Sequence, residues 1–318
     1  MNVKLFASLS LWALTMGSQA QEKIVPVKYG DMNQWVTRRI HESAVIGGNT
    51  KLLYELGPTK EIDGNVAYVN QGGSPWANSN VMAKVVGIVK TNTSVYPEKR
   101  ENNGYCARLE THIEKVKVLG LVNITVLASG SLYLGDMQEP ITGTKDGEKA
   151  LNMGIPFTSR PKAVRYDYKV QMSGEPNRIR LTGFSRKETV PGQDCAIMTC
   201  LLQKRTEDAE GNIIAKRVGT IAVKYMRSEG WQNGATYEIM YGDITHDKRY
   251  VPDLMKLGVG KYYARNKKGE SVLIQETGWA GKDEQPTHLI LQFTSSLGGA
   301  FVGSPGNKLW IDNVNLVY

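Results

Sequence analysis

Alternation of apolar and polar residues over short stretches is the feature that most limits how this chain can fold. Between Val164 and Met172, valine, tyrosine and methionine occupy every second position, with arginine, aspartate, lysine and glutamine between them. A period of two places successive side chains on opposite faces of a strand, so this segment predicts a strand with one buried face. Residues 289–293 repeat the pattern less strictly. Residues 196–202 are almost continuously apolar, which predicts a central strand covered on both faces.

The remaining sequence also favours strands over helices. The chain has 33 glycines and 15 tyrosines, a balance that favours strands joined by turns. Residues 207–212 predict a hairpin turn, and residues 31–54 fit either a helix or an entry strand. Further strand candidates are residues 84–89, 105–110, 116–128, 220–226, 236–240 and 309–318. Many short strands with turns between them predict a β-sandwich or a barrel.

The first twenty residues have the features of a cleavable signal peptide. Lys4 precedes an apolar run over residues 5–16, and small residues follow at Ser18 and Ala20, as signal peptidase requires. The run is shorter than the roughly 20 residues that span a bilayer, although it would also fit a buried N-terminal helix. We expect residues 1–20 to be removed and the mature chain to have no transmembrane span. No cysteine follows Ala20 to carry a lipid, so we expect a periplasmic protein, or one secreted or held at the surface through a partner.

Charge and cysteine content exclude some functions. The net charge is +8, but lysine and arginine are scattered among acidic residues without a basic block, so we expect no nucleic-acid binding. A mildly basic surface suits acidic glycans or an anionic envelope. Cys195 and Cys200 would point to opposite faces of one strand, and either could pair with Cys106. We favour three buried thiols, and the spacing of cysteine and histidine predicts no zinc site.

Four motifs in order carry a resemblance to a known family. They are residues 74–80 (SPWANSN), residues 104–111 (GYCARLET), residues 160–168 (RPKAVRYDY), and residues 295–303 followed by 309–314 (SSLGGAFVG and LWIDNV). Over about residues 60–318 the chain resembles the "putative carbohydrate metabolism domain" (PCMD) family of Bacteroidetes. The resemblance implies an exported jelly-roll β-sandwich, like carbohydrate-binding modules and galactose-binding-like domains, with a role in glycan handling. Residues 29–35 resemble the opening strand of such sandwiches, so we expect a single jelly roll over residues 21–318.

Aromatic residues are the first candidates for a glycan site, because sugar rings lie on exposed tryptophan or tyrosine while their hydroxyls take hydrogen bonds. Three tryptophans occur among glycine, asparagine and serine, and two tyrosines share one face of the strand around Asp167. The candidate ligand-binding residues are Trp76, Tyr166, Asp167, Tyr168, Trp231 and Trp279. Each tryptophan would equally fit the end of a core. If the tyrosines face the core, then Arg165, Asp167 and Lys169 form an exposed polar row.

Catalysis has weaker support in the sequence. Glycoside hydrolysis needs two carboxylates on either side of the scissile bond. Residues 61–66 begin like the Glu-x-Asp-x-x-Glu motif of laminarinase-like jelly rolls, but Val66 replaces the last carboxylate. We identify no catalytic pair and expect a non-catalytic glycan-binding protein of the bacterial envelope. The alternatives are a glycoside hydrolase or lyase of the jelly-roll class, and a structural or assembly subunit of the cell surface that binds an envelope protein.

A structural calcium ion is implied by the resemblance to carbohydrate-binding jelly rolls, which often hold Ca²⁺ between the first and last strands. Asp312 matches the last-strand ligand, and Asp31 is the candidate from the opening strand. Carboxylate and carbonyl oxygens suit this cation. The alternative for Asp312 is a carboxylate that accepts hydrogen bonds from turn amides.

Overall fold

The computed structural model describes residues 22–101, 104–118, 122–143, 147–183, 186–297, 299 and 301–318. The predicted signal peptide, residues 1–20, lies outside these ranges. Within them the chain is almost entirely β-structure, with one short α-helix, α1 (Pro252–Met255), and one 3₁₀ turn, η1 (Ala44–Ile46). The described helices are all too short to cross a membrane.

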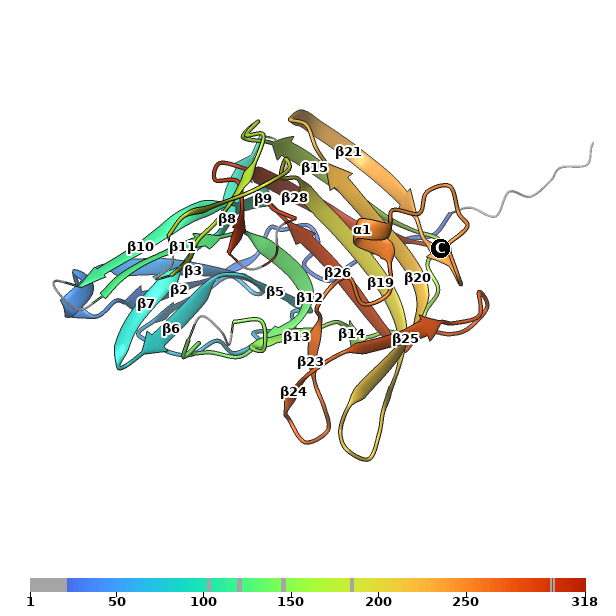
Figure 1. The fold of residues 1–318 in the computed structure, drawn as a ribbon, viewed down its shortest axis with the longest axis horizontal. Helices are drawn as coiled ribbons and strands as arrows, with labels where there is room; N and C mark the ends of the chain where they lie inside the picture. The colour runs from blue at the N-terminus through green and yellow to red at the C-terminus, as the bar shows by residue number, and fades with distance from the viewer. Residues whose placement is uncertain are drawn as a thin grey trace, which may run out of the picture.

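Two large sheets form the body of the molecule (Figure 1). The first, called here the β15 sheet, has the order β21 (Glu229–Glu238), β15 (Ala163–Gln171), β28 (Lys308–Val317), β9 (Gly104–Glu110) and β8 (Val95–Arg100), and β1 (Ile24–Pro26) also pairs with β28. The second, called the β19 sheet, has the order β13 (Leu151–Met153), β12 (Ser131–Met137), β26 (His288–Thr294), β19 (Ala196–Glu207), β20 (Ile213–Tyr225) and β22 (Met240–Tyr241). Strands β5 (Trp76–Asn78), β14 (Ile155–Pro156) and β25 (Gln275–Trp279) extend this second sheet.

The order in which the chain visits the two sheets gives a jelly roll. From β12 in the β19 sheet it crosses to β15, returns to β19 and β20, crosses to β21, returns to β26 and ends in β28. Nearly all neighbouring strands are antiparallel, and β25 runs parallel to β20. Repeated crossing between two packed antiparallel sheets is the jelly-roll arrangement. The expected all-β jelly-roll sandwich is confirmed.

The main core lies between the two sheets. On β15, Val164, Tyr166, Tyr168 and Val170 point into it, and alternate residues of β28, β19 and β26 meet them there. Strand β19 lies between β26 and β20. Met198, Cys200 and Leu202 belong to the main core, while Leu201 joins a second apolar cluster on the other face of the sheet. The prediction of a central strand over residues 196–202 is therefore confirmed.

Smaller sheets flank one side of the sandwich, drawn in blue to green in Figure 1. The smaller sheets comprise β2 (Trp35–His41) with β3 (Thr50–Leu56) and β4 (Lys60–Asp63), the hairpin of β6 (Val81–Val85) and β7 (Ile88–Asn92), and β10 (His112–Val118) with β11 (Val122–Ala128) and β17 (Thr182–Gly183). The ambiguous residues 31–54 contain β2 and most of β3, with the 3₁₀ turn η1 between them and no α-helix. A small apolar cluster made of Ile40, Leu53, Met82 and Val89 joins β2 and β3 to the β6–β7 hairpin. The expectation of a single jelly roll over residues 21–318 did not include these extra sheets.

Two further small sheets complete the described fold. They are β16 (Arg178–Arg180) with β18 (Glu188–Val190) and β27 (Val302–Gly303), and the hairpin of β23 (Tyr263–Arg265) and β24 (Ser271–Leu273).

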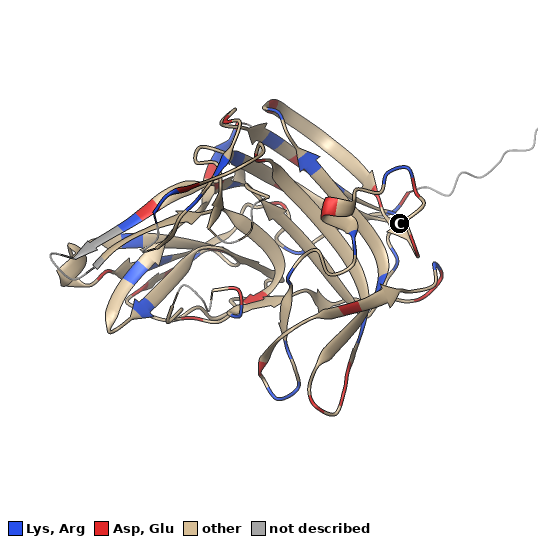
Figure 2. Ribbon diagram, in the orientation of Figure 1, with Lys and Arg blue, Asp and Glu red and all other residues tan. Residues whose placement is uncertain are grey.

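Some of the local predictions are confirmed and one is wrong. The hairpin turn at residues 207–212 is confirmed, because β19 ends at Glu207 and β20 begins at Ile213. Residues 84–89, expected as one strand, instead contain the β6–β7 turn at Val86–Gly87. All three cysteines are free and buried, as favoured above. Figure 2 shows lysine and arginine spread over the ribbon, with aspartate and glutamate among them.

Candidate functional site

Three of the six candidate ligand residues lie in the core. Trp76 is 1% exposed, and its indole Nε1 donates a hydrogen bond to the carbonyl of Lys28 at 2.9 Å. Tyr166 and Tyr168 are buried between the sheets, where the Tyr166 hydroxyl is hydrogen-bonded to the Tyr225 hydroxyl. A buried ring offers no surface to a sugar. The structure therefore favours the alternative in which these three side chains are structural.

The other three candidates are placed differently. Trp279, on β25, is half-buried and packs against a small cluster that includes Leu254 and Met255 of α1. Asp167 lies on the outer face of the β15 sheet, opposite the buried tyrosines. Trp231, on β21, is half-buried near Asp167, as the contacts below show. Of the six, the structure brings only Asp167 and Trp231 into one site.

Irregular strand pairing creates this site. The register between β15 and β28 shifts between Arg165 and Asp167, and the register between β15 and β21 shifts between Tyr166 and Tyr168. Asn313, on β28, has a φ of 51°, a left-handed value that asparagine tolerates better than most residues. Bulges of this kind bend a strand and turn its side chains away from the regular alternation. Three neighbouring strands are therefore irregular at the same level.

Arg100 is the centre of the buried part of the site. Its Nη1 donates to a carboxylate oxygen of Asp167 at 2.8 Å and to one of Asp312 at 2.6 Å. Its Nη2 donates to the amide oxygen of Asn233 at 2.6 Å. The Trp231 ring covers the guanidinium, with 3.9 Å between the guanidinium carbon and the ring centroid. Because β8 and β21 are opposite ends of the sheet order, Arg100 joins one end of the sheet to the other.

The two carboxylates that share Arg100 have pKa values shifted in opposite directions. Burial favours the neutral form of Asp167, but hydrogen bonds from Asn313, Arg100 and the amide of Gly234 outweigh it and lower its pKa. Burial dominates at Asp312 and raises its pKa to about 6, despite the hydrogen bond from Arg100. Asp312 is 1% exposed, and its second oxygen accepts a hydrogen bond from the amide of Asn313 at 2.8 Å.

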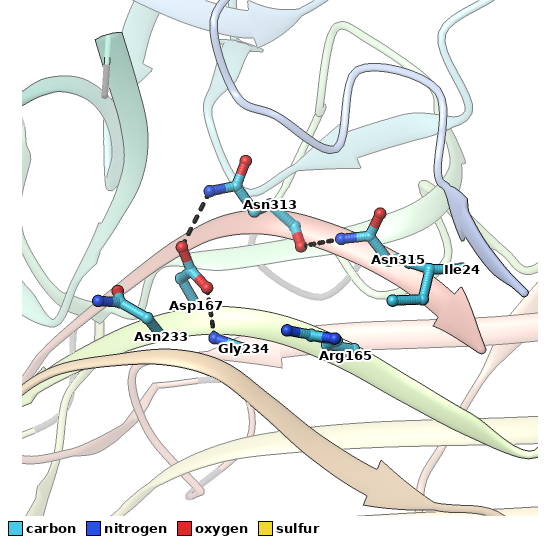
Figure 3. A pocket seen from close by; sticks show the side chains of 7 residues that line it. All are labelled: Ile24, Arg165, Asp167, Asn233, Gly234, Asn313 and Asn315. Atoms are coloured by element: carbon cyan, nitrogen blue, oxygen red, sulfur yellow. Dashed lines mark hydrogen bonds between the residues drawn. The ribbon is translucent and has the colours of Figure 1, made fainter. Parts of the chain in front are cut away.

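A polar pocket opens above this network (Figure 3). Its volume is about 330 Å³, and it is lined by Ile24, Arg165, Asp167, Asn233, Gly234, Asn313 and Asn315. Asp167 accepts hydrogen bonds from the Gly234 amide at 2.6 Å and from the Asn313 side chain at 2.9 Å. These bonds hold Asp167, Asn313 and the Gly234 backbone in place before any ligand arrives.

The predicted calcium ligands are not brought together in a way that fits this cation. Asp31 is exposed and accepts a hydrogen bond from the Asn33 side chain at 3.3 Å. Asp312 is paired with Arg100 and accepts a hydrogen bond from the backbone amide of Asn313 within β28, which is close to its alternative interpretation, although the amide lies in a strand and not in a turn. No group of three or more histidine, cysteine, aspartate or glutamate side chains within the described residues is placed to hold a metal ion. The positive charge of Arg100 would repel a calcium ion at Asp312, so we assign no calcium site here.

Other buried carboxylates are also paired with arginine. Arg38 bridges Glu55 and Glu139 under the small sheets, and Arg217 holds Glu276 at the edge of the β19 sheet. In each case a buried guanidinium pairs with the carboxylate, so these groups brace the fold. Sequence reasoning proposed no role for Arg100, Asn233, Asn313 or Asn315, although Asn233 follows Trp231 closely and Asn313 and Asn315 lie within or just after the LWIDNV motif.

The sequence model of the family described as "Putative carbohydrate metabolism domain" matches residues 59–317. The chain belongs to this family. All the residues that line the pocket lie within the PCMD match except Ile24, which β1 contributes. A comparison of this PCMD protein with curated proteins gives no match.

Solved structures with distant similarity to the PCMD protein include two proteins from Bacteroides. One is described as a putative glycoside hydrolase from Bacteroides vulgatus, with 17% identity, a TM-score of 0.41, and coverage of 70% of this chain and 76% of that one. The other is described as a putative glycoside hydrolase from Bacteroides thetaiotaomicron, with 16% identity, a TM-score of 0.43, and coverage of 85% of this chain and 75% of that one.

Proposed function

We propose that this PCMD protein binds a glycan in the polar pocket on the outer face of the β15 sheet, without cleaving it. The observation that carries the proposal is the set of fixed polar groups that line this pocket. Sugar hydroxyls act as both donors and acceptors, and asparagine side chains offer both. Here three asparagines surround one concave site. Membership of a carbohydrate metabolism family gives independent support.

The size of the pocket limits what it would take. About 330 Å³ is at the lower end of the roughly 300–1,000 Å³ typical of ligand pockets. That volume suits one sugar ring, or the end of a branch, better than several units of a chain. Trp231 lies beside the pocket over Arg100, where its remaining exposed surface would contact the apolar face of a neighbouring sugar.

The paired carboxylates argue for binding over hydrolysis. Asp167 and Asp312 both accept from the same nitrogen of Arg100. A glycosidase needs its two carboxyl groups free to reach opposite sides of the glycosidic bond. Here the guanidinium occupies the position between them, and Asp312 lies beneath the surface. The pair is therefore better suited to holding the pocket in shape than to acid–base chemistry.

The proposed location is outside the cytoplasm. The arrangement of Lys4, the apolar residues 5–16 and the small residues Ser18 and Ala20 supports export of the mature chain. We propose that the protein meets its glycan in the periplasm, or at the cell surface through an envelope partner. Expression of the full chain with separation of cellular fractions tests this: mature protein retained in the cytoplasm would overturn it.

The binding proposal is tested with the mature chain and a glycan array, followed by calorimetry on any glycan that binds. Asn315→Ala removes one amide from the pocket wall and should weaken binding several-fold. The matched control is Asn123→Ala, which changes an exposed asparagine on β11. Equal loss of binding in both variants, or no binding of the folded wild type to any glycan, would count against the pocket. Incubation of the wild type with the bound glycan should release no new reducing ends.

A further inference from the structure

We propose that the pocket selects a sugar bearing a carboxylate, a uronic acid, and that Arg165 pairs with that carboxylate. The inference rests on the proposed function and adds the chemical class of the ligand. It depends on three observations: the lack of a partner for Arg165, the position of its guanidinium against Gly234, and the compensation of the other charged group in the pocket.

Arg165 lines the pocket without a partner of its own. It is half-buried on β15, and within the described ranges its guanidinium makes no hydrogen bond and no ion pair. Arg100, in the same site, has three acceptors. A guanidinium carries five N–H donors and no acceptor. An anion is therefore the ligand best suited to pair with Arg165, because a charge that is partly buried without a partner is costly.

The Arg165 guanidinium lies against the backbone at Gly234. Gly234 has a φ of +64°, and a Cβ placed on it would lie 2.7 Å from Nη2 and 3.0 Å from Nε of Arg165. The guanidinium thus lies directly against the glycine, in space that the side chain of any other residue would fill. Figure 3 shows Arg165 and Gly234 side by side at the pocket. Because Gly234 has no side chain, the guanidinium can lie against the backbone at this wall of the pocket.

The other charged groups of the site already have partners. Asp167 accepts hydrogen bonds from Arg100, Asn313 and Gly234, so its oxygens are occupied by donors of the protein itself. The remaining polar wall consists of neutral amides. An acidic sugar would therefore meet one uncompensated cation, Arg165, with amides around it for the hydroxyls. The net charge of the whole chain, +8, favours the approach of a polyanionic polysaccharide.

A carboxylate fits Arg165 better than other ligand groups do. The planar guanidinium binds a carboxylate through two parallel hydrogen bonds, which adds orientation to the attraction between charges. A neutral sugar would offer only single hydroxyl contacts. Arg165 would then stay uncompensated, and the pocket would gain less from binding. The carboxylate-bearing ring of a uronic acid combines both kinds of group in a volume that the pocket can hold.

Calorimetry on the mature chain tests the inference with paired probes. Oligomers of galacturonic, glucuronic and mannuronic acid are compared with the same oligomers after reduction of their carboxylates to alcohols. We expect the acidic member of at least one pair to bind at least about tenfold more tightly than its reduced partner. This preference should fall as salt rises, because a partly exposed ion pair is screened.

Variants of Arg165 test whether this residue causes the preference for acidic oligomers. Arg165→Gln should remove most of the preference for the acid, because it should lower the affinity for the acidic oligomer far more than the affinity for the reduced one, and Arg165→Lys should keep part of the preference. The control is Arg227→Gln, at an exposed arginine between β20 and β21, which should bind like the wild type. Gly234→Ala should also lower the preference, since its Cβ displaces the guanidinium, and its melting temperature reports whether it has folded.

The outcomes separate the two proposals. Equal binding of acidic and reduced oligomers, lost in Asn315→Ala, would overturn the carboxylate inference and leave the glycan site standing. A preference for the acid that survives Arg165→Gln would overturn the role of Arg165. No binding of any oligomer by the folded wild type would count against the proposed function itself.

Discussion

Removal of the Arg100 side chain should destabilise the protein strongly, because this arginine compensates two buried carboxylates. In Arg100→Met the apolar part of the side chain is kept, while the bonds to Asp167, Asp312 and Asn233 are lost. Arg100 is only 6% exposed, so water cannot readily replace its guanidinium. Asp167 keeps two other donors, but Asp312 keeps only the backbone amide of Asn313.

The loss of stability expected in Arg100→Met follows from the burial of the ion pairs that Arg100 makes. Breaking a buried ion pair by removing one partner costs about 3–5 kcal/mol, because the charge that remains is uncompensated. Without residues 1–20 the chain has about 300 residues, and an unfolding entropy of roughly 2.1 cal/mol/K per residue gives roughly 0.6 kcal/mol/K for the whole. The expected loss therefore lowers the melting temperature by roughly 5–8 °C.

The assay is denaturant unfolding of the wild type and variant at pH 7, with calorimetric melting as a second measurement. The matched control is Arg249→Met. Arg249 also contacts two carboxylates, those of Glu238 and Asp247, but its side chain is 47% exposed. Exposed pairs contribute at most about 1 kcal/mol, so the control should change little. If Arg100→Met were no more destabilising than the control, the idea that Arg100 compensates buried charge would be wrong.

The pH dependence gives an independent check on the same reasoning. The pKa of Asp312 is raised in the fold to about 6, above its ordinary value of about 3.9, so the folded state binds more protons than the unfolded state between these values. Protonation through this window therefore favours folding at this residue. Without Arg100 the raised pKa moves further up. The stability deficit of Arg100→Met should be smaller at pH 5 than at pH 7, and adding Asp312→Asn should recover part of it at pH 7. An equal deficit at both pH values would contradict this.

Three further predictions concern residues outside the pocket. Tyr166→Phe removes the buried hydroxyl bonded to Tyr225 and should cost about 1 kcal/mol in denaturant unfolding, with no change in the affinity for a glycan measured by calorimetry. The three cysteines should stay unreactive toward a thiol reagent at pH 8 until the protein unfolds, because burial raises the pKa of each thiol to about 11 or 12. Val86 has a φ of 48°, is 95% exposed and begins a two-residue hairpin turn before Gly87. Asparagine adopts this left-handed conformation more readily than valine, by about 1 kcal/mol. Val86→Asn should therefore raise the melting temperature by roughly 1–2 °C.

The sequence predicted which residues share a face of β15, but not which face is buried. Alternation places Tyr166 and Tyr168 together and Arg165 and Asp167 opposite them, and this holds in the structure. Tyrosine is amphipathic and suits either a core or a surface, so its position alone did not decide. The apolar run at residues 196–202 was easier to interpret, because a strand with apolar residues on both faces must be covered on both.

The site depends on contacts that local patterns do not contain. Arg100 lies 67 residues from Asp167 and 212 residues from Asp312 along the chain. The register shifts around Asp167 also break the regular alternation on which strand prediction relies. The sequence identified Asp167 and Trp231 as candidates because Asp167 lies between two tyrosines and Trp231 lies among glycine and asparagine. Arginine and asparagine occur throughout the chain, and nothing local distinguishes the few that meet at the pocket.

The two arginines of the site are expected to have separable roles. Arg100 is enclosed by its acceptors and by Trp231, so its removal disturbs the walls of the pocket together with the stability of the fold. Arg165 has no hydrogen-bond or ion-pair partner within the described residues, so its removal should not lower the free energy of unfolding. A variant of Arg100 should therefore lose stability and affinity together, while a variant of Arg165 should lose affinity for an acidic sugar alone. This difference follows from burial and pairing, and it distinguishes an arginine that shapes the pocket from one that contacts the ligand.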